Sequence, residues 1–163
     1  MFVWFLTSLA LAEPSPTWTV SVDPLTTALG YVHVQTEVKI SDHFSVYSGP
    51  HLRLFDPPWT AAADREPFLG VGIESGVRWF PKGQAPEGFW LMGRGVIAYA
   101  WATDSDASNP AGYGSGLFGY TWIVGDHLVL ALGTGIQRID YGVGDYGLHT
   151  FFPAAHTNIG WSW

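Results

Sequence analysis

Six histidines are the residues of this sequence that could serve in the widest range of functional sites, because imidazole can bind a metal or act as a general base. They are His33, His43, His51, His127, His149 and His156. None of their spacings matches a metal-ligand motif, and cysteine is absent. We therefore predict no metal site, no cofactor and no catalytic residue. His33 and His51 are expected on neighbouring strands, as polar filling rather than as a metal pair.

Two further patterns have the composition of ligand-binding loops without their spacing. Segment 104–109, DSDASN, offers carboxylates for calcium but lacks the glycine and final glutamate of an EF-hand loop. The Gly-x-Gly pairs at 70–72 and 133–135 lie inside expected strands with no helix after them, unlike phosphate-binding loops. A solvated loop and small residues facing an interior explain these patterns better.

Charged residues alternate with aliphatic ones along several segments. In 30–40, Glu37 and Lys39 alternate with Val34, Val38 and Ile40, which is the period of a β-strand with one polar and one apolar face. The same period recurs in the segments that follow. The ionisable residues of interest, expected on the polar faces, are Glu37, Lys39, His51, Arg53, Glu74, Arg78, Arg94 and His156.

Eight strands position these residues. They are predicted at 17–27, 30–40, 44–55, 67–80, 89–103, 113–124, 128–140 and 151–163. Most are long enough to cross a bilayer, which takes roughly 9–11 tilted residues. Short connections at 41–43, 81–88 and 125–127 alternate with longer loops at 56–66, 104–112 and 141–150. The pattern predicts an all-β, eight-stranded antiparallel up-and-down transmembrane β-barrel.

The charges decide which face of the barrel is outside. An Arg or Lys that faces lipid at mid-depth costs about 2–4 kcal/mol, so four of them would unfold a marginal protein. Placed inside, Lys39, Arg53, Arg78 and Arg94 can neutralise Glu37 and Glu74. The lumen of eight strands is just wide enough for side chains to fill. We expect a charged lumenal network; exposed charges on a soluble sheet are the alternative.

Composition agrees with one barrel domain. The chain has 163 residues, and only 13% are charged, about half the usual fraction. A net charge of −7 argues against nucleic acid as a partner.

Residues 1–12, MFVWFLTSLALA, end in an A-x-A pattern and are expected to be a signal peptide. The barrel would then occupy residues 13–163.

Tryptophans lie mostly near predicted strand ends, where aromatic girdles meet the membrane interfaces. They are Trp59, Trp79, Trp90, Trp101, Trp122, Trp161 and Trp163.

The last strand ends on Trp163. The machinery that assembles outer-membrane barrels recognises such a terminal aromatic strand. Acidic loops could bind the cations that bridge lipopolysaccharide, although solvation alone explains them.

Several segments, in this order, resemble a family of uncharacterised bacterial outer-membrane β-barrel proteins. The resemblance rests on Asp23-Pro24-Leu25, Glu37 before the segment 39–45, Gly49-Pro50, the segments 74–80 and 85–91, and the terminal aromatic strand. It implies a small barrel in the bacterial outer membrane and brings no catalytic residues. The expected role is structural or surface interaction, with membrane lipid and lipopolysaccharide as partners.

Two other functions remain open. A soluble, lipocalin-like periplasmic barrel would bind a small apolar ligand. The apolar faces of its strands would line the interior, and the polar faces would be on the exterior. A lipid-modifying hydrolase is the second alternative, because His156-Thr157-Asn158 is faintly similar to the His-x-Ser-Asn motif of outer-membrane lipid A deacylases. The serine is absent here, and no carboxylate follows to orient His156. Shared hydrogen bonds of His156 and Asn158 in the lumen are therefore preferred.

Overall fold

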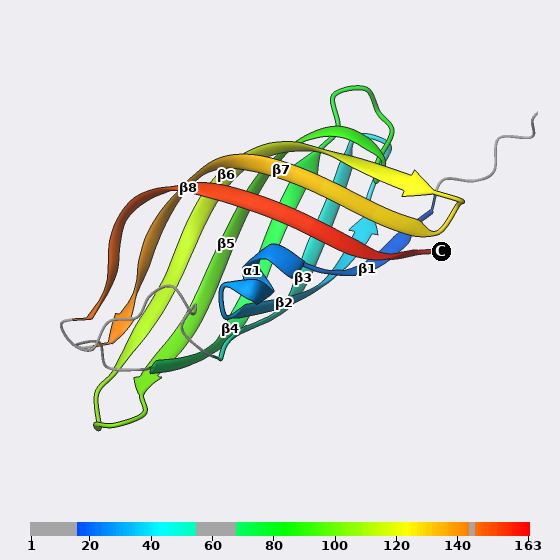
Figure 1. The fold of residues 1–163 in the computed structure, drawn as a ribbon. Helices are drawn as coiled ribbons and strands as arrows, with labels where there is room; N and C mark the ends of the chain where they lie inside the picture. Colours follow the sequence, from blue (N-terminus) through cyan, green and yellow to red (C-terminus); the bar gives the residue numbers. More distant parts are fainter. Residues whose placement is uncertain (1–15, 55–67, 144–145) are drawn as a thin grey trace, which may run out of the picture.

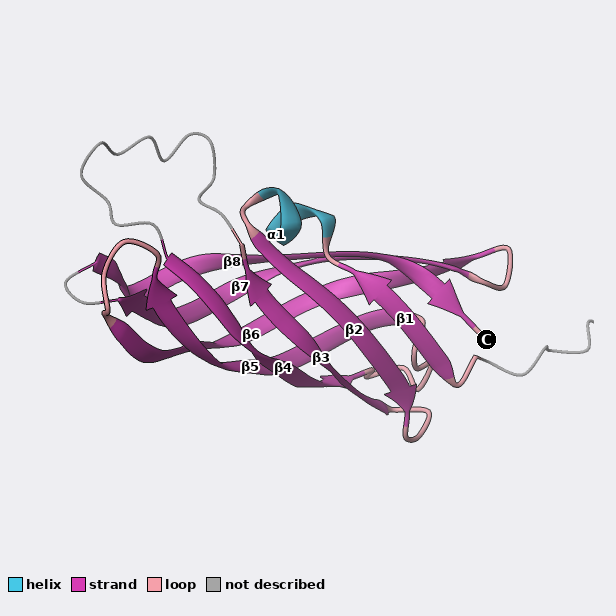
Figure 2. Ribbon diagram, turned by 90° about the horizontal axis from the view of Figure 1, so that it is seen from below, coloured by secondary structure: helices cyan, strands magenta, loops and turns pink. Residues whose placement is uncertain are grey.

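The computed structural model describes residues 16–54, 68–143 and 146–163, and the expected signal peptide lies outside them. The strands are β1 (Trp18–Val22), β2 (Tyr31–Lys39), β3 (Phe44–Arg53), β4 (Phe68–Trp79), β5 (Gly88–Ala102), β6 (Ser108–Val124), β7 (Leu128–Val143) and β8 (Tyr146–Ser162). Each strand pairs antiparallel with the next, and β1 pairs with β8 to close the barrel (Figures 1 and 2). The predicted all-β, eight-stranded antiparallel fold is confirmed.

A short helix, α1 (Pro24–Ala28), ends the first strand earlier than predicted. The sequence pattern indicated a strand over 17–27, but β1 stops at Val22. Pro24 cannot donate to a strand ladder and is pre-organised for a first helical position. The Asp23 side chain caps the helix by accepting from the backbone N–H of Thr26 at 3.1 Å. Among the described residues, no helix has the length and apolarity to cross a membrane.

Two hairpins extend into segments that were predicted as loops. β6 begins at Ser108, β7 continues as far as Val143, and β8 begins at Tyr146. Their polar composition suggested loops, yet cross-strand partners hold the ladder together: Asp140 lies opposite His149, with 2.6 Å between Oδ1 and Nδ1. These hairpins lie at the left-hand end of Figure 1, and the C-terminus lies at the opposite end.

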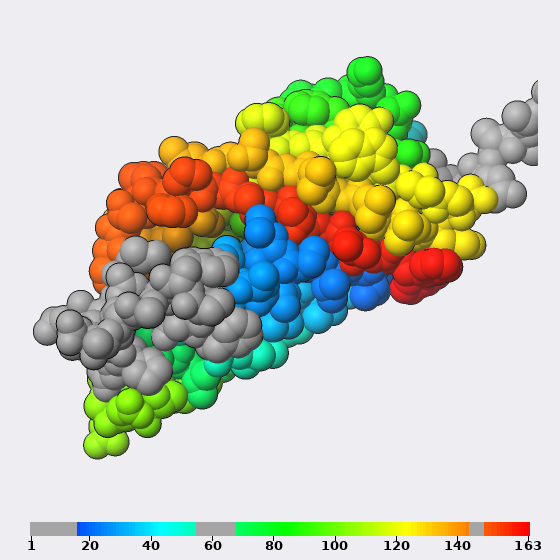
Figure 3. All heavy atoms as spheres, viewed as in Figure 1, coloured from blue at the N-terminus to red at the C-terminus, as the bar shows by residue number. Residues whose placement is uncertain are grey.

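Strand β5 shows how the wall separates two environments. Its residues alternate between buried and exposed without interruption from Gly88 to Ala102. Ile97 faces outward and is 79% exposed, whereas its neighbour Ala98 faces the lumen and is 7% exposed. Figure 3 shows side chains packed over the wall where β8 lies beside β1 and α1. The alternation in β5 therefore places large apolar side chains outside, and it places Arg94 inside together with buried apolar residues.

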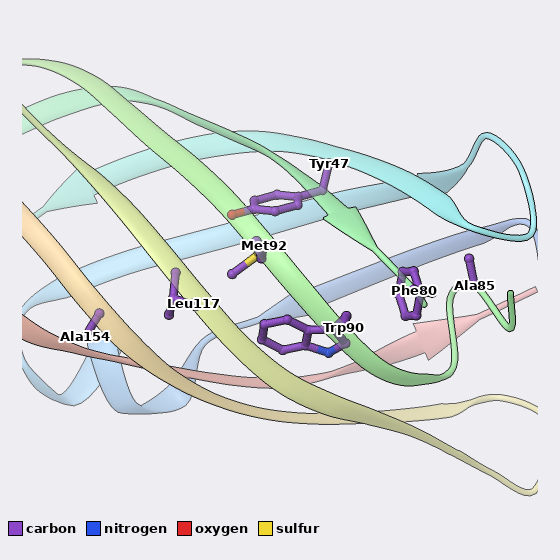
Figure 4. Close-up of a cluster of buried hydrophobic side chains, with 7 residues drawn as sticks. All are labelled: Tyr47, Phe80, Ala85, Trp90, Met92, Leu117 and Ala154. Carbon is purple, nitrogen blue, oxygen red and sulfur yellow. The ribbon is translucent and has the colours of Figure 1, made fainter. Parts of the chain in front are cut away.

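Trp90 differs from the predicted interfacial girdle, because it lies inside the barrel and is fully buried. It packs in a cluster with Tyr47, Phe80, Ala85, Met92, Leu117 and Ala154 (Figure 4). Its Nε1 donates to the Thr121 hydroxyl at 3.0 Å. Trp90 occupies one of the alternating positions of β5 that face the lumen. Its place near a strand end had suggested the membrane interface instead. The exposed tryptophans include Trp79, Trp101, Trp122, Trp161 and Trp163, whereas Trp59 lies outside the described residues.

Glycines in the wall make room for the Trp90 ring. A Cβ on Gly133 would lie 2.4 Å from Cη2 of Trp90 and 3.0 Å from the Phe118 carbonyl oxygen. We expect Gly133→Val to lower the free energy of unfolding by about 1–3 kcal/mol, the usual effect of overpacking. Urea titration followed by tryptophan fluorescence measures this change. Gly93→Val is the matched control, since a Cβ there meets nothing within 4 Å; equal effects of the two substitutions would contradict the packing.

Candidate functional site

The lumen holds most of the ionisable residues that were expected on the polar faces. Seven of the eight are buried: Glu37, His51, Arg53, Glu74, Arg78, Arg94 and His156. Lys39 is the exception and is partly exposed at the end of β2. Buried charges require partners, because an unpaired charge in a low dielectric is strongly unfavourable. The contacts of each group therefore define the site.

Glu37 on β2 forms the first half of the network. Its Oε2 lies 2.5 Å from Nη1 of Arg78, and its Oε1 accepts from the Ser45 hydroxyl. The strand register explains the proximity, because Ser45 on β3 lies directly opposite Arg78 on β4. Nη2 of Arg78 reaches across the lumen to Nε2 of His156, at 2.7 Å. Since β4 and β8 lie on opposite sides of the ring, this contact spans the barrel.

Glu74 on β4 is the centre of the second half. Its Oε1 accepts from Nε2 of Gln35 at 2.8 Å and from the Tyr47 hydroxyl at 3.1 Å. Its Oε2 accepts from the Tyr113 hydroxyl at 2.8 Å and lies 3.0 Å from Nδ1 of His33. A carboxylate that accepts several hydrogen bonds is held in its charged form and in one orientation.

Arg94 and His156 join the two halves. Nη1 of Arg94 lies 3.7 Å from Oε1 of Glu74 and 3.4 Å from Nδ1 of His156. The Arg94 guanidinium also lies over the Tyr113 ring, 5.5 Å from its centroid, where a cation–π attraction acts. The two carboxylates, Glu37 and Glu74, are thus balanced by two guanidinium groups, those of Arg78 and Arg94. The charges of these four side chains therefore cancel.

Lys39 and Arg53 do not take the partners predicted for them. Nζ of Lys39 lies 2.8 Å from Oδ1 of Asp42 in the β2–β3 turn, because Lys39 is near the barrel end. This pairing holds the pKa of the Asp42 carboxyl below its usual value. Arg53, near the opposite end of the wall, donates to the Phe68 carbonyl and to the Tyr31 hydroxyl. Neither contact reaches the carboxylates of the central network.

The His156-Thr157-Asn158 segment lies beside a carboxylate that its sequence neighbourhood did not suggest. Asp23, which precedes α1, accepts from the Thr157 hydroxyl at 2.6 Å, and its Oδ2 lies 3.8 Å from Nδ1 of His156. The Thr157 hydroxyl therefore donates to Asp23 and not to the imidazole. The lumenal Asn158 donates to Gln35 at 2.8 Å. This arrangement ties β8 to α1 and to β2.

Sequence reasoning missed several uncharged members of the network. They are Gln35, Tyr47 and Tyr113, which lie on the inward faces of their strands, whereas His33 and Asn158 were already expected inside the barrel. The alternation could have identified them, because it places every second residue of a strand inside. Their specific partners depend on the register of strands that are distant in sequence. The geometry as a whole supports a side-chain network that holds opposite walls of the barrel together.

Comparison with known proteins adds no relative. No protein-family model matches the chain, and neither curated proteins nor solved structures give a match.

Proposed function

We propose that the chain is an integral protein of a bacterial outer membrane with a structural or surface-interaction role and a filled, polar lumen. One observation carries the proposal: charges are buried while large aliphatic side chains cover the outside. Outward-facing exposed residues include Val34, Val46, Val71, Ile73, Val77, Ile97, Leu132, Ile136 and Ile159. Exposed apolar surface on this scale marks a membrane or protein contact rather than a surface in water.

The limits of the apolar surface fit a membrane-embedded band. On β7, the outward-facing Leu132 and Ile136 are followed by Arg138 and Asp140. Arg138 lies over the Phe151 ring, 5.5 Å from its centroid, at the edge of this band. A change from aliphatic to charged residues beside an aromatic ring is typical of the membrane interface.

The lumen favours this function over a soluble barrel that binds an apolar ligand. Such a barrel would need an apolar cavity, whereas Arg78, Glu74 and Arg94 fill the middle of this lumen. Membrane lipid and lipopolysaccharide are then the partners of the outer wall. The barrel assembly machinery would recognise β8, whose pairing with β1 closes the barrel.

Cell fractionation combined with gel mobility tests this proposal. We expect the protein in the outer-membrane fraction, and we expect its mobility on a gel to change after boiling, as it does when a barrel unfolds. The charges would then be inside a spanning barrel. Recovery in the soluble periplasmic fraction, without a heat-dependent shift, would overturn the proposal and favour the ligand-binding barrel.

A further inference from the structure

We propose that His33, His51 and Glu74 form a site for a divalent transition-metal ion inside the lumen. The three residues come from the neighbouring strands β2, β3 and β4 and are all fully buried. One ligand atom from each lies within 4.8 Å of the others. The site goes beyond the proposed role of the barrel, since a filled lumen needs no metal to span a membrane.

Strand register brings the three ligands together. His33 and His51 lie directly opposite each other in the β2–β3 ladder, and Glu74 lies opposite Gly49, two residues before His51. Nε2 of His33 is 2.7 Å from Nδ1 of His51, and Nδ1 of His33 is 3.0 Å from Oε2 of Glu74. A tetrahedral ion with bonds of about 2.0–2.1 Å separates its ligand atoms by about 3.3 Å. These two contacts use different nitrogens of His33, so binding of a common ion requires the His33 ring to turn until one nitrogen faces both His51 and Glu74.

The Nδ1 atom of His33 is close to Glu74 but is not aligned for a hydrogen bond with it. Although this atom lies 3.0 Å from the Glu74 carboxylate, it makes no hydrogen bond within the described part of the chain. A buried polar atom without a hydrogen bond is rare and unfavourable. Coordination of a metal by Nδ1 would give this atom a partner.

Neighbouring hydroxyl groups orient the other two ligands. The Tyr141 hydroxyl lies 3.3 Å from Nε2 of His51; when Nε2–H donates to it, the Nδ1 lone pair faces His33. The Tyr113 hydroxyl donates to Oε2 of Glu74, and this oxygen keeps a second lone pair for an ion. Metal-binding histidines and carboxylates usually have such partners, which fix the tautomer and the direction of the lone pair.

The ligand set determines the class of ion. Two imidazoles with one carboxylate suit Zn²⁺, Co²⁺, Ni²⁺ or Fe²⁺, whereas Ca²⁺ and Mg²⁺ prefer oxygen ligands alone. Arg94 approaches the other carboxylate oxygen, Oε1, so its charge lies away from the side of Glu74 that faces His33. Water can complete the coordination of an ion held by three side chains.

Zinc binding to the full-length barrel, folded in detergent without a histidine tag, tests the site. We expect one Zn²⁺ per chain by titration calorimetry and elemental analysis after dialysis, and at least tenfold weaker binding by His51→Ala. His149→Ala is the matched control, because His149 is exposed and pairs with Asp140. Binding that is equally strong in wild type and His51→Ala, or equally weakened by His149→Ala, would overturn the site.

A spectroscopic measurement on the unmodified protein keeps the test independent of variants that fail to fold. Co²⁺ replaces Zn²⁺ in such sites, and its visible absorption is intense when four-coordinate and weak when six-coordinate in water. We expect intense bands that saturate at one Co²⁺ per chain and disappear when Zn²⁺ is added. A spectrum identical to that of aqueous Co²⁺ would contradict the proposal, whatever the behaviour of the variants.

Discussion

Glu37→Leu will lower the free energy of unfolding by about 3–5 kcal/mol, the usual effect of removing one partner of a buried ion pair. Arg78 is fully buried, and the substitution deprives its Nη1 of a carboxylate at 2.5 Å. Ser45 also loses the acceptor of its hydroxyl. Leucine matches the volume of glutamate well enough that the lost pairing, rather than a cavity, dominates the change. Urea unfolding of the barrel in lipid vesicles measures it.

Two variants serve as controls for this prediction. Lys39→Met breaks the ion pair with the exposed Asp42 at the barrel end, so its effect should stay below about 1 kcal/mol. The double variant Glu37→Leu/Arg78→Met should recover part of the stability lost in Glu37→Leu, because no buried charge is left without its partner. A loss below about 1 kcal/mol for Glu37→Leu would mean that Glu37 is solvated, against the lumenal network.

The second large effect concerns the outer wall. Ile73 on β4 is 53% exposed and pairs with Ile97 on β5, between the levels of Trp79 and Trp101. In a bilayer, Ile73→Arg places a charge near mid-depth and should cost about 2–4 kcal/mol. In water the same exposed substitution would change stability by only about 0.5 kcal/mol. The free energy of unfolding from vesicles distinguishes the two environments.

Ile40→Arg provides the matched comparison. Ile40 is 63% exposed but follows β2 at the short turn, so an arginine there can reach water. We expect a cost of at most about 1 kcal/mol, as found near membrane interfaces. If Ile73→Arg and Ile40→Arg have the same small effect, the aliphatic wall does not face lipid.

The barrel itself was predictable because its information is local. Alternation between aliphatic and polar residues indicates the strands, as β2 illustrates from Tyr31 to Lys39. Strand ends were less predictable. Pro24 ended β1 by starting a capped helix, and the polar segment from Ser108 continued a hairpin because its partner strand supplied hydrogen bonds. Composition alone does not distinguish a polar loop from a polar strand end.

The lumenal contacts required information that the sequence does not carry locally. The alternation placed Glu74 inside the barrel, but only the strand register shows that His33 lies beside it. Asp23 approaches His156 although 133 positions separate them, because β1 closes on β8. Such contacts follow from barrel closure rather than from spacing along the chain.

Spin labels on the outer wall test most directly whether that wall faces lipid. The chain has no cysteine, so Ile97→Cys, Tyr99→Cys and Asp104→Cys each provide one labelling site. Ile97 and Tyr99 lie on the outer face of β5, and Asp104 is exposed in the β5–β6 turn. In vesicles, labels at 97 and 99 should collide mainly with dissolved O₂, and the label at 104 with a water-soluble nickel complex. Frequent collisions with the nickel complex at all three positions would contradict a membrane-spanning barrel.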